Sequence, residues 1–169
     1  MGRDKALLEI EGELLWRRQL ATLQQLSPEQ LMLSGPRRDG WSEDEIVSDV
    51  VVDAGPLAGV AAALQKCKTP HLVVLAIDLP RMTADFLRSL LTLCDDDRGA
   101  VPRTAGGFEP LAAVYPASCA ALAAAALRSA DFSMQSFVRE AMKLHLLVER
   151  RIFAAETPLF TNLNTPAEL

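Results

Sequence analysis

Two kinds of hydrophobic pattern alternate along the chain. Apolar residues recur at helical spacing in residues 12–26, 55–67, 84–91, 117–130 and 133–144. Short apolar runs typical of strands occupy residues 29–34, 45–53, 71–77, 99–103, 110–116 and 145–149. Because strands and helices alternate, the pattern predicts an α/β fold with a mostly parallel sheet.

Several positions mark where these elements begin. Pro56 suits the first position of a helix, and Thr83 suits the N-cap of the next one. The uninterrupted run at 71–77 is typical of a central parallel strand that is buried on both faces. Near the end, Thr165-Pro166-Ala167-Glu168 forms a capping box for a helix that we expect to be cut short.

Length and composition favour one domain over residues 1–169. The net charge of −5 argues against a general nucleic-acid binder, whose affinity would come from clustered Lys and Arg. No apolar run approaches the roughly 18 residues of a membrane span. The three cysteines are far apart in sequence and form no CxxC pair, which favours a reduced, cytoplasmic protein with no zinc site.

Polar residues that follow apolar runs are the first candidates for chemistry, because ligands of parallel α/β sheets bind beyond the carboxyl ends of the strands. Asp78 follows the most apolar run and could bind a magnesium ion carried by a nucleotide. It could also cap the next helix, but Thr83 is better placed for that. Asp53 precedes Gly55 at another such end, where it is either a ligand contact or a solvated turn residue.

Two further candidates lie near the ends of the chain. Lys5 could bind phosphate, or it could belong to an unstructured basic N-terminus. Asn162 and Asn164 alternate, so an extended segment would direct both amides to one face. They suit a ligand with mixed donors and acceptors, such as a pterin or purine, or they form an Asx-turn.

Five segments occur together in an order that resembles the molybdenum cofactor guanylyltransferases: MGRDKALLEI, VVDAGPLAGV, AIDLP, FEPLAAVYP and NLNTPAEL. The resemblance covers Met1 to Leu169. It implies a Rossmann-like, three-layer α/β/α nucleotidyltransferase. Such an enzyme transfers GMP from magnesium-bound GTP to molybdenum-molybdopterin and releases pyrophosphate. Cofactor-insertion proteins and molybdoenzymes are the protein partners that the resemblance suggests.

The resemblance also implies roles for single residues. Lys5 would hold nucleotide phosphate, Asp78 would bind Mg²⁺, and Asp53 would contact the nucleotide. Ser34 stands where the family often has an asparagine near the nucleotide, and its hydroxyl could make one of the same hydrogen bonds. Asn162 and Asn164 would lie on the pterin side.

The start of the chain differs from the family pattern. Family members begin with an apolar strand and a Leu-Ala-Gly-Gly loop, followed by an Arg-Met-Gly-x-Asp-Lys stretch, and this chain starts at that Met. We therefore expect the first strand and the nucleotide-cradling loop to be missing, through a late start codon or a truncation.

Other functions remain open at this stage. A related cytidylyltransferase for the same pterin, or a sugar-phosphate nucleotidyltransferase, would share the fold. A non-catalytic remnant that binds nucleotide or pterin belongs to another class. The presence of Lys5, Asp53 and Asp78 argues against the remnant, because a binding module would not need a metal-binding carboxylate.

Overall fold

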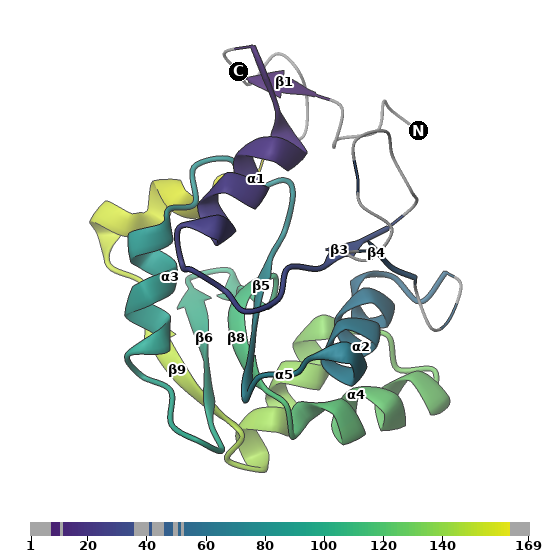
Figure 1. The fold of residues 1–169 in the computed structure, drawn as a ribbon. Helices are drawn as coiled ribbons and strands as arrows, with labels where there is room; N and C mark the ends of the chain where they lie inside the picture. The colour runs from purple at the N-terminus through teal and green to yellow at the C-terminus, as the bar shows by residue number, and fades with distance from the viewer. Residues whose placement is uncertain are drawn as a thin grey trace.

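The computed structural model describes residues 8–10, 12–35, 41, 46–48, 51 and 53–162 (Figure 1). The described α-helices are α1 (Leu15–Gln24), α2 (Pro56–Lys66), α3 (Ala84–Leu91), α4 (Cys119–Arg128) and α5 (Met134–Lys143). A 3₁₀ helix, η3 (Ala154–Phe160), comes late in the chain. The five predicted helices up to residue 144 are confirmed, whereas the capping box at 165–168 lies outside the described residues.

The described strands are mostly short. They are β1 (Glu9–Ile10), β2 (Glu13–Leu14), β3 (Leu33–Ser34), β4 (Ile46–Val47), β5 (His71–Leu75), β6 (Gly99–Thr104), β7 (Gly107–Phe108), β8 (Ala112–Pro116) and β9 (Leu147–Arg151). Strand structure was predicted at six of these places, but not for the hairpin β1–β2 or for β7. η3 was not predicted either.

The main sheet is mixed, which corrects the prediction of a mostly parallel one. Its order is β5-β8-β6-β7, and β9 pairs with β6. β6 and β9 are parallel, but β8 runs antiparallel to both β5 and β6. β5, β6 and β9 therefore point the same way, so their carboxyl ends meet at one edge, next to the start of β8.

Alternate residues of the sheet pack against helices on its two faces. Val101, Ala113 and Tyr115 belong to a buried cluster with α2, α4 and α5. Ala100 and Ala112 belong to a second cluster, on the face covered by α3. The arrangement gives three layers, with the sheet between helices (Figure 1).

β5 differs from the fully buried central strand that its sequence predicts. Of its five side chains only Leu72 is buried, and the other four are partly exposed. The physical reason is its pairing: β5 bonds to β8 on one side, and no other described strand bonds to its opposite side.

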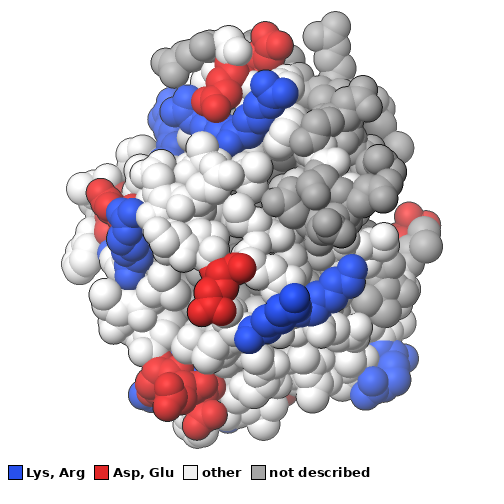
Figure 2. Space-filling model, viewed as in Figure 1, with Lys and Arg blue, Asp and Glu red and all other residues white. Residues whose placement is uncertain are grey.

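The surface carries charges of both signs. On the face in Figure 2, the described Lys and Arg side chains are interspersed with Asp and Glu and form no continuous basic band. Among the described helices, none has the length and apolar character needed to cross a membrane.

Candidate functional site

Asp78 lies in a turn just beyond β5, at the carboxyl edge of the sheet. The turn is held from two sides. The backbone N–H of Ala76 donates to the carbonyl of Leu111 at 2.7 Å. Gln19 of α1 donates its side-chain N–H groups to the carbonyls of Ala76 (3.0 Å) and Leu79 (2.7 Å). These bonds place the half-buried Asp78 on a fixed backbone.

Gln19 is a positioning residue that the sequence analysis did not identify. It is 5% exposed, and it links α1 to a turn about 60 residues later in the chain. Its sequence signal is its place four residues after Leu15, on the apolar face of α1. The amide N–H groups of Gln19 find carbonyl partners, as buried donors require, whereas its Oε1 is buried without a hydrogen-bond partner among the described residues.

Asp53 precedes α2 in a conformation that few residues adopt. Its φ is +61°, in the left-handed region, and its side chain is exposed. Gly55, the N-cap of α2, has φ +62° and ψ −158°, a region that is essentially restricted to glycine. Pro56 then begins the helix as predicted. Non-glycine residues with positive φ often occur at functional sites, which is why Asp53 remains a candidate.

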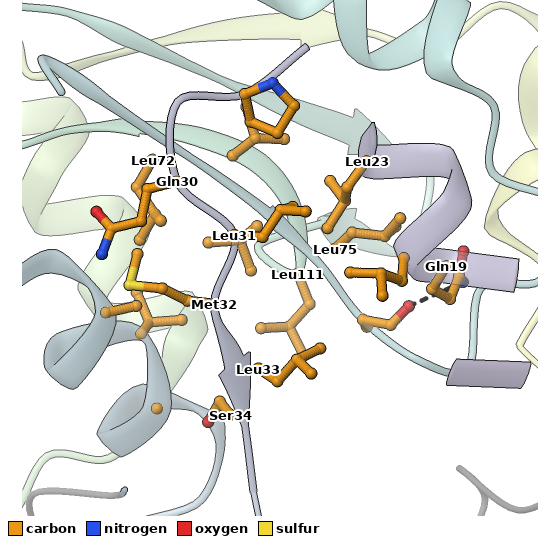
Figure 3. A pocket seen from close by; sticks show the side chains of 18 of the residues that line it. Gln19, Leu23, Gln30, Leu31, Met32, Leu33, Ser34, Leu72, Leu75 and Leu111 are labelled. Carbon is orange, nitrogen blue, oxygen red and sulfur yellow. Dashed lines mark hydrogen bonds between the residues drawn. The ribbon is translucent and has the colours of Figure 1, made fainter. Parts of the chain in front are cut away.

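Ser34 ends β3 and is exposed, and together with Asp78 it lines a groove of about 600 Å³. Figure 3 shows that leucines from several elements dominate this groove, including Leu33, Leu72, Leu75 and Leu111. The groove follows the side of β5 that no described strand pairs with. An apolar lining suits hydrophobic packing better than charged phosphates. We therefore expect the phosphates to contact the polar groups of Asp78 and Ser34 and not the leucines that line much of the groove.

Asn162 lies just after η3, in an exposed position. η3 is anchored to the α3 face, where the rings of Phe86 and Phe160 meet edge to face at 5.2 Å. Arg150 and Glu156 add a bidentate ion pair at 3.0 and 2.6 Å. The predicted pairing of Asn162 with Asn164 is not tested, because Asn164, like Lys5, lies outside the described residues.

Glu109 is a second carboxylate near the edge that carries Asp78, and the sequence analysis did not single it out. It follows β7, and its carboxylate accepts a hydrogen bond from the Thr104 hydroxyl at 3.0 Å. Burial raises the pKa of Glu109, and the hydrogen bond from Thr104 offsets part of that effect. Its sequence signal was an acidic residue between apolar strands, which is weak by itself.

Few side chains among the described residues are placed to act as ligands of a metal ion. The described residues contain no group of three or more His, Cys, Asp or Glu that could hold an ion. Burial raises the pKa of Cys119 to about 12 and is the main reason why that of Cys94 is about 11, so both remain protonated thiols. Asp78 alone still fits magnesium, which proteins often bind through one or two carboxylates plus the phosphates of a substrate.

Comparison with known proteins identifies the family. A family model described as a MobA-like NTP transferase domain matches residues 1–145. A probable molybdenum cofactor guanylyltransferase from Opitutus terrae is 42% identical over 143 residues, which are 82% of this chain and 71% of that protein. The molybdenum cofactor guanylyltransferase of Pseudomonas aeruginosa is 32% identical, over 98% of this chain and 83% of that protein.

Solved structures agree on the fold. Molybdopterin-guanine dinucleotide biosynthesis protein A from Archaeoglobus fulgidus superposes with a TM-score of 0.71 at 24% identity, over 99% of this chain and 87% of that one. 2-C-methyl-D-erythritol 4-phosphate cytidylyltransferase from Thermus thermophilus superposes with a TM-score of 0.70 at 14% identity, over 97% of this chain and 89% of that one. The fold is thus that of nucleotidyltransferases, and by its match over residues 1–145 the chain belongs to the MobA-like NTP transferase family.

Proposed function

We propose that the protein is a molybdenum cofactor guanylyltransferase. It transfers GMP from GTP to the terminal phosphate of molybdenum-molybdopterin and releases pyrophosphate. The observation that carries the proposal is Asp78 on a turn fixed by Gln19, at the carboxyl edge of the sheet, in a member of this family. The relatives named guanylyltransferase support guanine over cytosine as the base.

The reaction needs no protein nucleophile. An oxygen of the acceptor phosphate attacks the α-phosphorus of GTP in line, a new P–O–P bridge forms, and the bond to the β-phosphate breaks. Catalysis then rests on positioning and charge stabilisation. Asp78 would hold Mg²⁺, which when bound supplies positive charge to the phosphates. Lys5 would bind phosphate, while Ser34 and Asp53 would contact the nucleotide and Asn162 and Asn164 the pterin.

The test combines product analysis with one isosteric change. The protein is incubated with GTP or CTP, Mg²⁺ and molybdenum-molybdopterin, and the dinucleotide product is identified by chromatography and mass. Asp78→Asn should lower turnover by about 100-fold or more, because a charge that acts in the transition state is lost. Circular dichroism should show an intact fold.

The matched control is Asp96→Asn. Asp96 is exposed in the loop just before β6, and so lies at the opposite edge of the sheet. The Asp96→Asn variant should keep the full rate of nucleotidyl transfer. Normal turnover in a folded Asp78→Asn variant would reject the assignment of Asp78. A product made from CTP and not from GTP would replace guanylyl with cytidylyl transfer.

A further inference from the structure

The carboxylate of Glu109 is partly buried and has no cationic partner among the described residues. Its one side-chain hydrogen bond comes from Thr104 at 3.0 Å. By contrast, Glu149 on β9 pairs with Arg103 and Arg151. A carboxylate that is partly removed from water and lacks a cation gains most from ligand groups that donate hydrogen bonds.

Hydrogen bonds along the strands show where Glu109 lies. Its backbone N–H donates to the carbonyl of Pro102 at 2.9 Å, so it sits beside β6. In the ladder of β5 and β8, Leu75 pairs with Ala112. Residues just before Ala112 are therefore next to the turn that follows β5, which carries Asp78.

The face of the sheet can also be assigned. Ala100 packs on the α3 face, so by alternation Pro102 and Thr104 of β6 lie on that face as well. Glu109 is adjacent to Pro102 and bonded to Thr104, which puts it on the same side. η3 covers this face through Phe160, two residues before Asn162. Glu109 thus shares a face with the segment that leads to the proposed pterin contact.

A rigid hairpin supports this position. Gln135 of α5 accepts from the backbone N–H of Phe108 at 3.3 Å and donates to the Phe108 carbonyl at 2.7 Å. Thr104 also accepts a hydrogen bond from the backbone N–H of Gly106 at 3.2 Å. The backbone on both sides of the β6–β7 turn is therefore fixed, as a residue that selects a ligand requires.

The chemistry of the ligand follows from what the carboxylate can accept. Two oxygens offer about four acceptor sites, and Thr104 uses one. A pterin ring presents two adjacent donors on its pyrimidine edge, the 2-amino group and N3–H, and the guanine of GTP presents the same pair as its 2-amino group and N1–H. The face that Glu109 shares with η3, which leads to Asn162, favours the pterin.

We propose that Glu109 selects the pterin ring of the acceptor by accepting hydrogen bonds from its 2-amino group and its N3–H. The inference rests on the proposed function and adds a specificity residue to it. Lumazine, in which a 2-oxo group replaces the 2-amino group, discriminates this contact from general stacking. It retains N3–H but turns the second donor into an acceptor that a carboxylate repels.

The experiment measures binding of 6-hydroxymethylpterin and 6-hydroxymethyllumazine by saturation-transfer NMR, which detects weak ligands. The wild-type protein should prefer the pterin by at least about 10-fold, the contribution of one hydrogen bond to a charged group. Glu109→Gln offers one acceptor and one donor, which match lumazine. Its preference should move towards lumazine by about 100-fold.

Glu149→Gln is the control, because it removes a carboxylate from the same sheet that is already ion-paired. Its preference should equal that of the wild type. Equal binding of the two rings by the wild type, no binding of the pterin, or an unchanged preference in Glu109→Gln would overturn the proposal. A Glu109→Gln variant that keeps the pterin preference but no longer distinguishes GTP from ITP, which lacks the 2-amino group, would assign Glu109 to guanine instead. The wild-type comparison requires no variant and so does not depend on whether Glu109→Gln folds.

Guanylyl transfer is measured on the same preparations, so that the two proposals fail separately. Turnover without a pterin preference would reject the role of Glu109 and keep the proposed function. A pterin preference without turnover would keep the role of Glu109 and reject the proposed function.

Discussion

The ion pair between Arg150 and Glu156 should stabilise the protein more than the other ion pairs of the described residues. Their side chains are only 16% and 23% exposed, and two hydrogen bonds join them. Glu156 also accepts the backbone N–H of Phe153 at 3.0 Å, and the Arg150 guanidinium lies 4.4 Å from the ring centre of Phe86. The pair therefore fastens η3 to the α3 face.

The magnitude follows from the number of charged hydrogen bonds. Glu156→Gln keeps the shape but removes the charge from three bonds, so we expect a loss of about 2 kcal/mol in the free energy of unfolding. For a chain of this length that corresponds to a decrease in Tm of about 4–8 °C. The matched control is Glu140→Gln, whose partner Lys143 is 69% exposed. A surface pair of this kind should change the free energy by about 0.5 kcal/mol at most.

The pH dependence gives an independent check of the same interaction. Arg150 holds the pKa of Glu156 below its ordinary value, with help from the Phe153 N–H and against a smaller effect of burial. The stabilisation is therefore complete above the unfolded-state pKa of about 4.3, and it is lost as the pH falls through the lower folded-state value. The Tm difference between wild type and Glu156→Gln should be constant from pH 7 to about 5 and shrink below about 4.

Thermal unfolding followed by circular dichroism measures both effects. A double-mutant cycle with Arg150→Met separates the ion pair from the packing of Arg150 on Phe86. A coupling energy below about 0.5 kcal/mol would mean that the pair contributes no more than a surface one, and the reasoning would be wrong.

Two further predictions concern the backbone around the site. Gly55→Ala should lower the free energy of unfolding by about 1–3 kcal/mol, because alanine is strained at φ +62° although a Cβ would meet no atom within 4 Å. At Gly106 φ is ordinary and the nearest atom to an added Cβ is 3.6 Å away, so Gly106→Ala should leave the free energy of unfolding nearly unchanged. Denaturant titration of both variants measures the difference. Thr83→Ala should lower the free energy of unfolding by about 1 kcal/mol, because the Thr83 hydroxyl oxygen accepts a hydrogen bond from the Phe86 N–H at 3.2 Å. Thr83→Ser keeps this acceptor and should retain most of the wild-type stability.

The parts of the fold that could be predicted depend on local signals. The helix that Pro56 begins and the helix that Thr83 caps were expected from the sequence, and both form. These signals act within one turn of the helix, so they do not require knowledge of the tertiary structure.

The parts that could not be predicted depend on distant partners. An apolar run does not specify strand direction, so the antiparallel β8 was missed. The turn at β7 is held by Gln135, 27 residues later, and η3 packs through Phe160 on Phe86, which precedes it by 74 residues. Gln19 likewise acts across about 60 residues. Local patterns contain none of these contacts.

Three carboxylates near the proposed site have different surroundings, and these explain why one acidic chain could bind two anionic substrates. Asp53 is exposed in a strained turn, Asp78 is half-buried on a fixed one, and Glu109 is half-buried with a hydroxyl donor. In a protein of net charge −5, triphosphate binding requires added positive charge, which we propose comes from Lys5 and from magnesium on Asp78. The pterin ring is neutral and rich in N–H donors, so an acidic Glu109 favours it without a cation. We therefore expect the same sheet edge to separate its two substrates, with the triphosphate near the magnesium on Asp78 and the neutral pterin ring against Glu109.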